Sequence, residues 1–199
     1  MKVKNLFVAA AIAAFFPACS QILPPVIQSP EAIAELAADL KKISKDYKIE
    51  KVVVHEKDEL SGIFGMGVVD LRDSKDALYE QVLYYNFSIP HNDPKPRKER
   101  ISDPKNPSYL NVDDIIERKD LIGKYVEEAK AQLPEGYTFE SVDFMTFKPD
   151  DQGAFSLSFE IQVTETGKAP RMEGGRKVTD YYELKFYVDK DGNITHDEW

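Results

Sequence analysis

Hydrophobic positions along the chain form two helical patterns, and each is followed by stretches with the two-residue period of β-strands. The first helical pattern starts at Ser29, Pro30 and Glu31. These residues supply an N-cap oxygen, a proline at the first helical position and an acid near the positive end of the dipole. Apolar residues then recur at three- and four-residue steps, at Ile33, Leu36, Leu40, Ile43 and Tyr47. This spacing predicts a helix of about four turns that buries one face.

Three strand-like stretches follow the first helical pattern, at residues 49–55, 64–71 and 78–89. In the second stretch, large apolar residues alternate with Gly65 and Gly67, a pattern typical of a half-buried strand with a thin outer face. The first half of the chain is therefore predicted to be a helix followed by an antiparallel meander.

The second helical pattern begins at Asn111 or Asp113, and its spacing fits one long helix or two short ones. Three strand-like stretches follow it, at residues 137–147, 155–164 and 178–189. Asp191 and Gly192 then predict a hairpin turn that leads into a short last strand at residues 193–199. The second half of the chain thus repeats the order of elements predicted for the first.

The two halves also share sequence, because YEQVLYYNF at residues 79–87 resembles YELKFYVD at residues 182–189. Aligning these stretches pairs Tyr79 with Tyr182, Leu83 with Phe186 and Tyr84 with Tyr187. A second match, at a different offset, aligns residues 47–52 with residues 137–142. We therefore predict an α+β fold of two αβββ repeats, at residues 30–89 and 112–199. A helix must cover the apolar side of each meander, so both helices are expected on one face of an antiparallel sheet.

The N-terminus has the pattern of an export signal. Lys2 and Lys4 precede an apolar run that is shorter than the roughly 20 residues of a transmembrane helix, so residues 1–18 are predicted to be a signal peptide. Cys19 is the only cysteine and follows a small residue, which resembles the lipobox of bacterial lipoproteins. Phe16 departs from the aliphatic residue usual in that family.

The lipobox resemblance implies a protein that is exported to the cell envelope and anchored through a lipid on Cys19. The membrane would be an outer membrane, with the protein on its periplasmic side or at the surface. Residues 19–29, which contain Pro24 and Pro25, would then form a tether between the lipid and the first helix. A soluble secreted protein is the alternative.

Residues 90–111 separate the two predicted repeats and contain five prolines with several lysines and arginines between them. Two interpretations are open. The segment is either a basic arm for an anionic lipid headgroup or an acidic partner, or a solvated linker kept extended by its charges. The linker is the simpler interpretation.

Composition and motifs argue against several classes of protein. The formal net charge of -9 is opposite to the basic face that a nucleic-acid backbone requires. The sequence contains no HExxH or GxSxG motif, and the glycine run that includes Gly65 and Gly67 precedes a strand where a phosphate loop would precede a helix. We therefore predict a protein that is not an enzyme and uses no metal or other cofactor.

Two segments contain residues that could bind a metal, and each also fits a simpler structure. His196 and its acidic neighbours could meet His55 and Glu56 if the last strand lay beside the first strand of the other half. Residues 189–193 superficially resemble a calcium loop but lack the spacing of its ligands, so a hairpin turn is favoured. Neither segment changes the prediction that no metal is bound.

Three tyrosines are the candidate binding residues. Tyr84 and Tyr187 fall one position off the alternation that should face the core, and Tyr181 is in line with Tyr187. Large aromatic side chains with a polar tip are typical anchors for a protein or peptide partner. The alternative is that this face of the sheet is covered by the other repeat, the linker or a further helix.

Tandem αβββ units with a terminal Asp-Gly hairpin, exported and lipid-anchored, resemble PepSY-like and β-lactamase-inhibitor-protein-like modules. The YELKFYVDKDGNI segment, the helix before each meander and the region around Cys19 carry this resemblance. Cystatin-like and NTF2-like folds remain alternatives. The resemblance implies a non-enzymatic role in which the open sheet face binds a protein or peptide partner. A carrier of a small ligand or lipid, with a pocket between helix and sheet, is the second hypothesis.

Overall fold

The computed structural model describes residues 24–197, apart from residues 102, 104 and 106. The predicted signal peptide and the predicted lipidation site Cys19 lie outside the described residues. The predicted tether does not extend to residue 29, because Ile27 is fully buried and its N–H donates to the Gly62 carbonyl at 2.8 Å. Among the described residues, no helix is both long enough and apolar enough to cross a membrane.

The first helix, α1, spans Pro30–Ile43 and begins as the sequence predicts. The Ser29 hydroxyl oxygen accepts a hydrogen bond from the Ala32 N–H at 3.2 Å, which satisfies one of the free donors at the helix start. One face of the helix is fully buried, and it includes Ile33, Leu36 and Leu40. The periodic apolar residues therefore mark the side of α1 that packs against the sheet.

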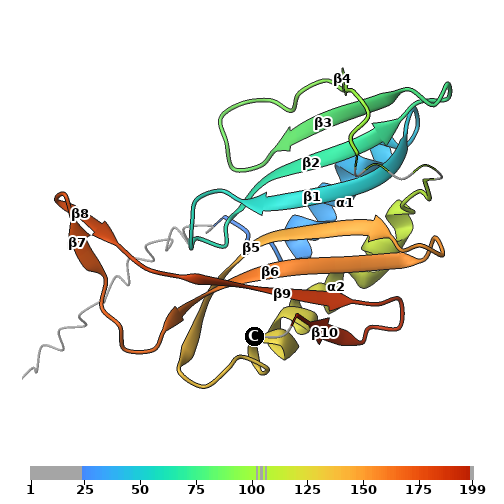
Figure 1. The fold of residues 1–199 in the computed structure, drawn as a ribbon. Helices are drawn as coiled ribbons and strands as arrows, with labels where there is room; N and C mark the ends of the chain where they lie inside the picture. The colour runs from blue at the N-terminus through green and yellow to red at the C-terminus, as the bar shows by residue number, and fades with distance from the viewer. Residues whose placement is uncertain (1–23, 102, 104, 106, 198–199) are drawn as a thin grey trace, which may run out of the picture.

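The second helix, α2, spans Val112–Lys130 without a break, so the single long helix is confirmed over two short ones. Its N-cap is Asn111, whose side chain accepts a hydrogen bond from the Asp113 N–H at 3.1 Å. The two helices pack against each other and lie on the same side of the sheet (Figure 1).

Eight strands form one antiparallel sheet in the order β10-β9-β6-β5-β1-β2-β3-β4. In the first half, the strands are β1 Lys48–Glu56, β2 Phe64–Arg72, β3 Leu78–Tyr84 and β4 Lys95–Pro96. In the second half, they are β5 Tyr137–Pro149, β6 Phe155–Glu165, β9 Tyr182–Val188 and β10 Ile194–His196. A separate hairpin, formed by β7 Arg171–Glu173 and β8 Arg176–Val178, projects from the body (Figure 1).

The two halves meet in the middle of the sheet, where β1 and β5 pair from Val52 opposite Phe147 to His55 opposite Phe144. In each half a helix precedes a three-stranded meander, β1-β2-β3 or β5-β6-β9. The predicted α+β fold with helices on one face is thereby confirmed. That the two halves are repeats of one αβββ unit stays a prediction.

The core lies between the helices and the sheet. Alternate residues of the central strands point toward the helices and are fully buried, among them Val54, Phe147 and Phe159. The rings of Phe159 and Phe186 stack with their centroids 5.6 Å apart, on neighbouring strands. The intervening residues point to the opposite side, the open face, which carries Val53 and Thr146 at its centre.

Most described residues of the 90–111 segment are exposed, as its prolines and charges predict, but part of the segment is bound to the sheet. After β4, the chain crosses the sheet over β3 and β2 (Figure 1). The Arg97 side chain is only 8% exposed, and its Nε lies 3.3 Å from the Asp70 Oδ1 on the open face. It also makes ion pairs with Glu50 and Asp103. Arg97 is therefore neutralised inside the protein and is not free to bind an anionic headgroup.

Two predicted strand boundaries are wrong. The stretch at residues 78–89 ends as a strand at Tyr84, because Tyr85 stacks on Phe64 at 4.0 Å and Asn86 has a positive φ of 54°. The stretch at residues 178–189 is divided between β8 and β9. The predicted turn at Asp191 and Gly192 is confirmed as the hairpin between β9 and β10.

Candidate functional site

In the part of the chain that the structure describes, no helix covers the open face, and its side chains form rows that cross the strands. One row consists of small residues, Val82, Val68, Val53, Thr146 and Ser158, running from β3 to β6. Valine and threonine on neighbouring strands pack closely and leave a shallow surface. The centre of the open face is therefore smooth and half-apolar.

The next row contains larger side chains, in the order Tyr84, Met66, His55, Phe144, Glu160 and Lys185 from β3 to β9. The His55 and Phe144 rings lie 5.8 Å apart, and Tyr84 meets the edge of Phe87 at 6.0 Å. Phe87 is 39% exposed. The row thus changes from aromatic and apolar over the first half to charged over the second.

All three tyrosines singled out from the sequence lie on the open face. Tyr84 is half-buried at one side, and Tyr187 is 37% exposed on β9. Four strands separate them, so they are roughly 24 Å apart at ordinary strand spacing. Tyr181 donates a hydrogen bond to the Glu59 Oε1 at 3.3 Å. Their positions agree with the sequence alternation, and their role in binding stays a prediction.

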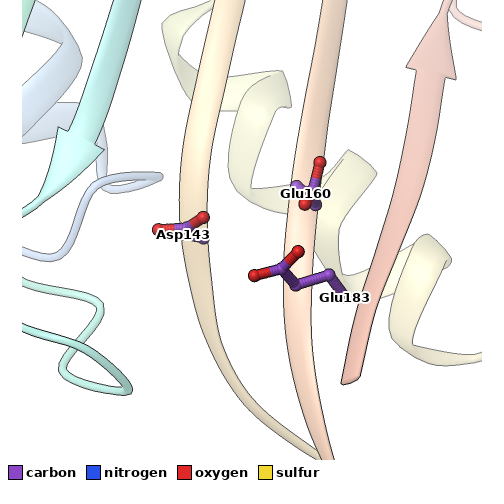
Figure 2. Close-up of side chains that lie close together, drawn as sticks. All are labelled: Asp143, Glu160 and Glu183. Atoms are coloured by element: carbon purple, nitrogen blue, oxygen red, sulfur yellow. The ribbon is translucent and has the colours of Figure 1, made fainter. Parts of the chain in front are cut away.

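Three carboxylates gather on the second half of the open face. Asp143, Glu160 and Glu183 come from β5, β6 and β9, and each places one carboxylate oxygen within 4.8 Å of the others (Figure 2). Glu160 and Glu183 are on adjacent strands, whereas Asp143 is the extra residue of a β-bulge between Val142 and Phe144. A bulge redirects a side chain that regular pairing would place elsewhere. We call these three residues the carboxylate cluster.

The cluster changes the proton affinity of its members. Partial burial, followed by the hydrogen bond and charge of Glu183, raises the pKa of Glu160 to about 7. Burial and the charge of Glu183 likewise raise the pKa of Asp143, although His55 opposes this shift. A hydrogen bond between two carboxyl groups requires a proton on one of them. Glu160 therefore exchanges its proton near neutral pH.

The histidine cluster considered from the sequence does not form. His55 is on the central strand β1, and His196 is on the edge strand β10, with β5, β6 and β9 between them. The pKa of His55 is lowered by burial, against the opposing effect of Asp143. His91 is part of a loop contact, since its Nε2 lies 3.0 Å from the Asp39 Oδ2 and its Nδ1 accepts the Tyr84 N–H.

The carboxylate cluster offers three oxygen donors, the type of ligand that hard divalent cations take, and other ligands would have to complete the coordination of such an ion. Its chemical property is a localised negative potential, with one carboxyl that titrates near neutral pH. A basic side chain would complete it by pairing with the ionised carboxylates and displacing the shared proton.

Sequence reasoning did not find this cluster. Its members lie far apart along the chain, and only the register of β5, β6 and β9 together with the bulge at Asp143 brings them together. The available signal was limited to Glu160 and Glu183, which occupy open-face positions of predicted strands, whereas Asp143 alternates in step with the buried Met145 and Phe147. Register is not visible in the alternation of a single strand.

No family model, curated protein or solved structure matches this chain. The resemblance to PepSY-like and β-lactamase-inhibitor-protein-like modules therefore stays a prediction. The fold and the site together define an α+β protein with a single large sheet. Helices cover one face of this sheet, and the other face carries the carboxylate cluster beside a row of aromatic side chains.

Replacing Glu160 with glutamine is expected to stabilise the protein at about pH 8 by about 1 kcal/mol, a value discounted for solvent screening of a partly exposed group. A raised pKa means that the folded state holds its proton more tightly. The stability that this bound proton contributes to the wild type is complete below the ordinary pKa of a glutamate carboxyl. It is lost as pH rises through the folded-state pKa of about 7. Urea unfolding should give a smaller difference between acid and neutral pH for Glu160→Gln than for wild type.

The matched control is Glu128→Gln, since Glu128 is exposed on α2. It should leave the pH dependence unchanged. An unaltered pH profile in Glu160→Gln as well would show that the carboxylate cluster does not share a proton in the folded state.

Proposed function

We propose that this protein binds a protein partner through the open face and performs no catalysis there. The partner presents a basic side chain to the carboxylate cluster, and apolar groups to the row that includes Tyr84, Met66 and Phe144. The observation that carries the proposal is this cluster of two half-buried carboxylates and one exposed carboxylate, next to half-exposed aromatic side chains, on a sheet face that no helix of the described residues covers.

Charge complementarity supports a basic partner. Burial already disfavours the ionised forms of Asp143 and Glu160, so an incoming lysine or arginine lowers a cost that the free protein bears. The nearby Lys185 only partly offsets the charge of Glu160. Binding of a cation should release a proton near neutral pH, and its affinity should rise with pH and fall with salt.

The apolar part of the open face supports a contact of protein size. Tyr84 and Tyr187 lie roughly 24 Å apart across the open face. A standard interface, which buries about 800 Å² per partner, is wide enough to include both. Aromatic side chains in such positions are the residues that most often dominate binding energy.

The second hypothesis was a carrier with a ligand between helix and sheet. In the middle of that layer, Leu36, Val54 and Phe159 are fully buried. Close packing of this kind favours contacts between the side chains over a central ligand. The partner-binding proposal is therefore the better supported of the two.

We further propose that the protein acts in the cell envelope, exported by residues 1–18 and anchored by a lipid on Cys19, with the residues between Cys19 and Pro25 as the tether. The sequence pattern at the N-terminus is the support for this part of the proposal. A membrane anchor would confine the open face to partners that reach the same surface.

Photocrosslinking in cells tests the proposal. A crosslinking residue replaces Thr146 on the open face or, as control, Glu128 on α2, in the anchored protein and in Cys19→Ala. We expect a salt-sensitive product from position 146 only, mapping to a basic segment of the partner. It should be lost when Asp143, Glu160 and Glu183 are changed to Asn, Gln and Gln.

Equal products from both positions, or a product that survives neutralisation of the carboxylate cluster, would overturn binding at the open face. A product that forms equally with Cys19→Ala would leave the open face in place but would argue against the need for an anchor.

A further inference from the structure

The edge strand β9 is paired on its outer side over only part of its length. β10 covers Phe186, Tyr187 and Val188, and no other strand in the described part of the chain pairs with β9 from that side. The first residues of β9, from Tyr182 to Lys185, therefore form a strand edge. Such an edge is a template for an added strand.

The direction of the backbone groups on this edge follows from the hairpin. The Asp189 N–H donates to the Asn193 carbonyl at 3.1 Å, so the N–H of Asp189 points toward β10. Because backbone groups alternate along an antiparallel strand, the N–H groups of Tyr187, Lys185 and Glu183 point in the same direction as that of Asp189. Glu183 and Lys185 consequently turn their N–H and C=O groups outward, away from β6.

A cavity lies beside this edge on the side of the sheet that faces the helices. It has a volume of about 370 Å³ and is lined by Pro134, Tyr137, Tyr182, Glu183 and Leu184. The rings of Tyr137 and Tyr182 meet edge to face at 5.5 Å. Leu184 is half-buried, and Tyr182 is 41% exposed. Most of this lining is apolar, and the cavity is large enough for an aliphatic or aromatic side chain.

The other side of the same edge is acidic. Glu183 belongs to the carboxylate cluster on the open face, whereas its neighbours Tyr182 and Leu184 face the cavity. Successive residues of an added strand point to alternate sides of the sheet. One side chain would therefore enter the cavity, and the next would lie beside Glu183.

We propose that an extended segment of the partner, with alternating apolar and basic residues, adds to the edge of β9 as a further strand. This inference rests on the proposed function and specifies how the partner engages it. Main-chain hydrogen bonds to Glu183 and Lys185 hold the segment, and the alternation selects its sequence. An apolar residue fills the cavity, and a basic residue pairs with the carboxylate cluster.

The probe is a capped peptide of alternating valine and lysine, about as long as a typical strand. A peptide of identical composition, with all valines before all lysines, controls for charge and hydrophobicity. We expect the alternating peptide to bind about tenfold more tightly in a calorimetric titration. Hydrogen exchange should show new protection of the Glu183 and Lys185 amides.

The decisive variants are Lys185→Pro and Lys185→Ala. Both remove the same side-chain charge, but only proline removes the outward N–H, and it leaves the ladder between β9 and β6 intact. Lys185→Pro should bind the alternating peptide no better than the block peptide, whereas Lys185→Ala should keep the preference. If the proline variant folds poorly, Tyr182→Ala takes its place as the test. This variant removes one wall of the cavity and should weaken binding of the alternating peptide several-fold.

Equal binding of the two peptides would overturn the strand-addition proposal. So would amides of Glu183 and Lys185 that are already protected without peptide and gain no protection when it binds. Crosslinks from position 146 would then still support partner binding at the open face. Conversely, loss of those crosslinks with normal peptide binding would overturn the open-face proposal and leave the edge as an isolated binding site.

Discussion

Replacement of Arg97 with alanine is expected to lower the free energy of unfolding by about 3 kcal/mol. The side chain is buried against three carboxylates, Glu50, Asp70 and Asp103, each no more than 8% exposed. Removing the cation leaves these charges in a poorly solvated place with fewer partners, and breaking a buried ion pair from one side is strongly destabilising. Urea denaturation at neutral pH measures the change.

Arg100→Ala is the matched control, because Arg100 approaches the same Asp70 but is 46% exposed. An exposed ion pair contributes less than about 1 kcal/mol, so this variant should remain close to wild type. Equally small losses in both variants would show that residues 90–111 do not hold Arg97 against the sheet in solution.

The Arg97 contact also has a signature at low pH. The hydrogen bond from Arg97 keeps the pKa of Asp103 below its usual range. A lowered pKa stabilises the fold above the ordinary carboxyl value, and that contribution is lost as pH falls through the folded-state pKa. Arg97→Ala should therefore lose less stability than wild type on acidification.

Replacing Tyr84 and Tyr187 together with alanine is expected to weaken binding of the crosslinked partner by about 30-fold or more, the size of a loss at one or two binding hot spots. Both side chains point away from the core, and their loss removes aromatic area from opposite sides of the open face. Affinity is measured with the partner identified by crosslinking, and circular dichroism and thermal unfolding should match wild type closely.

The control is Leu121→Ala on α2, since Leu121 is as exposed as Tyr187, at 37%. It removes a similar exposed apolar group from the helical side and should not change partner affinity. Unchanged affinity in the double tyrosine variant would contradict the use of the open face. Tyr181→Ala should have a smaller effect, because Tyr181 is tied to Glu59 near the loop between β1 and β2.

The local features of the fold could be predicted because they depend on neighbours in sequence. Ser29 and Asn111 mark helix starts through side-chain hydrogen bonds within a few residues. The alternation of β6 places Phe159 on the buried side without knowledge of any other strand. Aligning the two tyrosine-rich stretches correctly placed Tyr84 and Tyr187 on the side away from the core.

The candidate site and the path of residues 90–111 depend on contacts between distant residues. Asp143 joins Glu160 only through a bulge, which shifts the register after Val142. Arg97 is buried because Asp70 and Glu50 happen to face it from two other strands. Composition indicated a solvated segment, and the ion pairs of Arg97 with Glu50 and Asp70, which bind part of the segment to the sheet, have no signal in the local sequence.

The pairing of β1 with β5 has a consequence for how the chain folds. Strands within each meander are near neighbours in sequence, but Val52 to His55 must find partners across a loop of roughly 90 residues. Closing a loop of that length costs entropy before any contact between the halves repays it. Each meander can form early on its helix, and the rate-limiting step is expected to be their docking along this central seam.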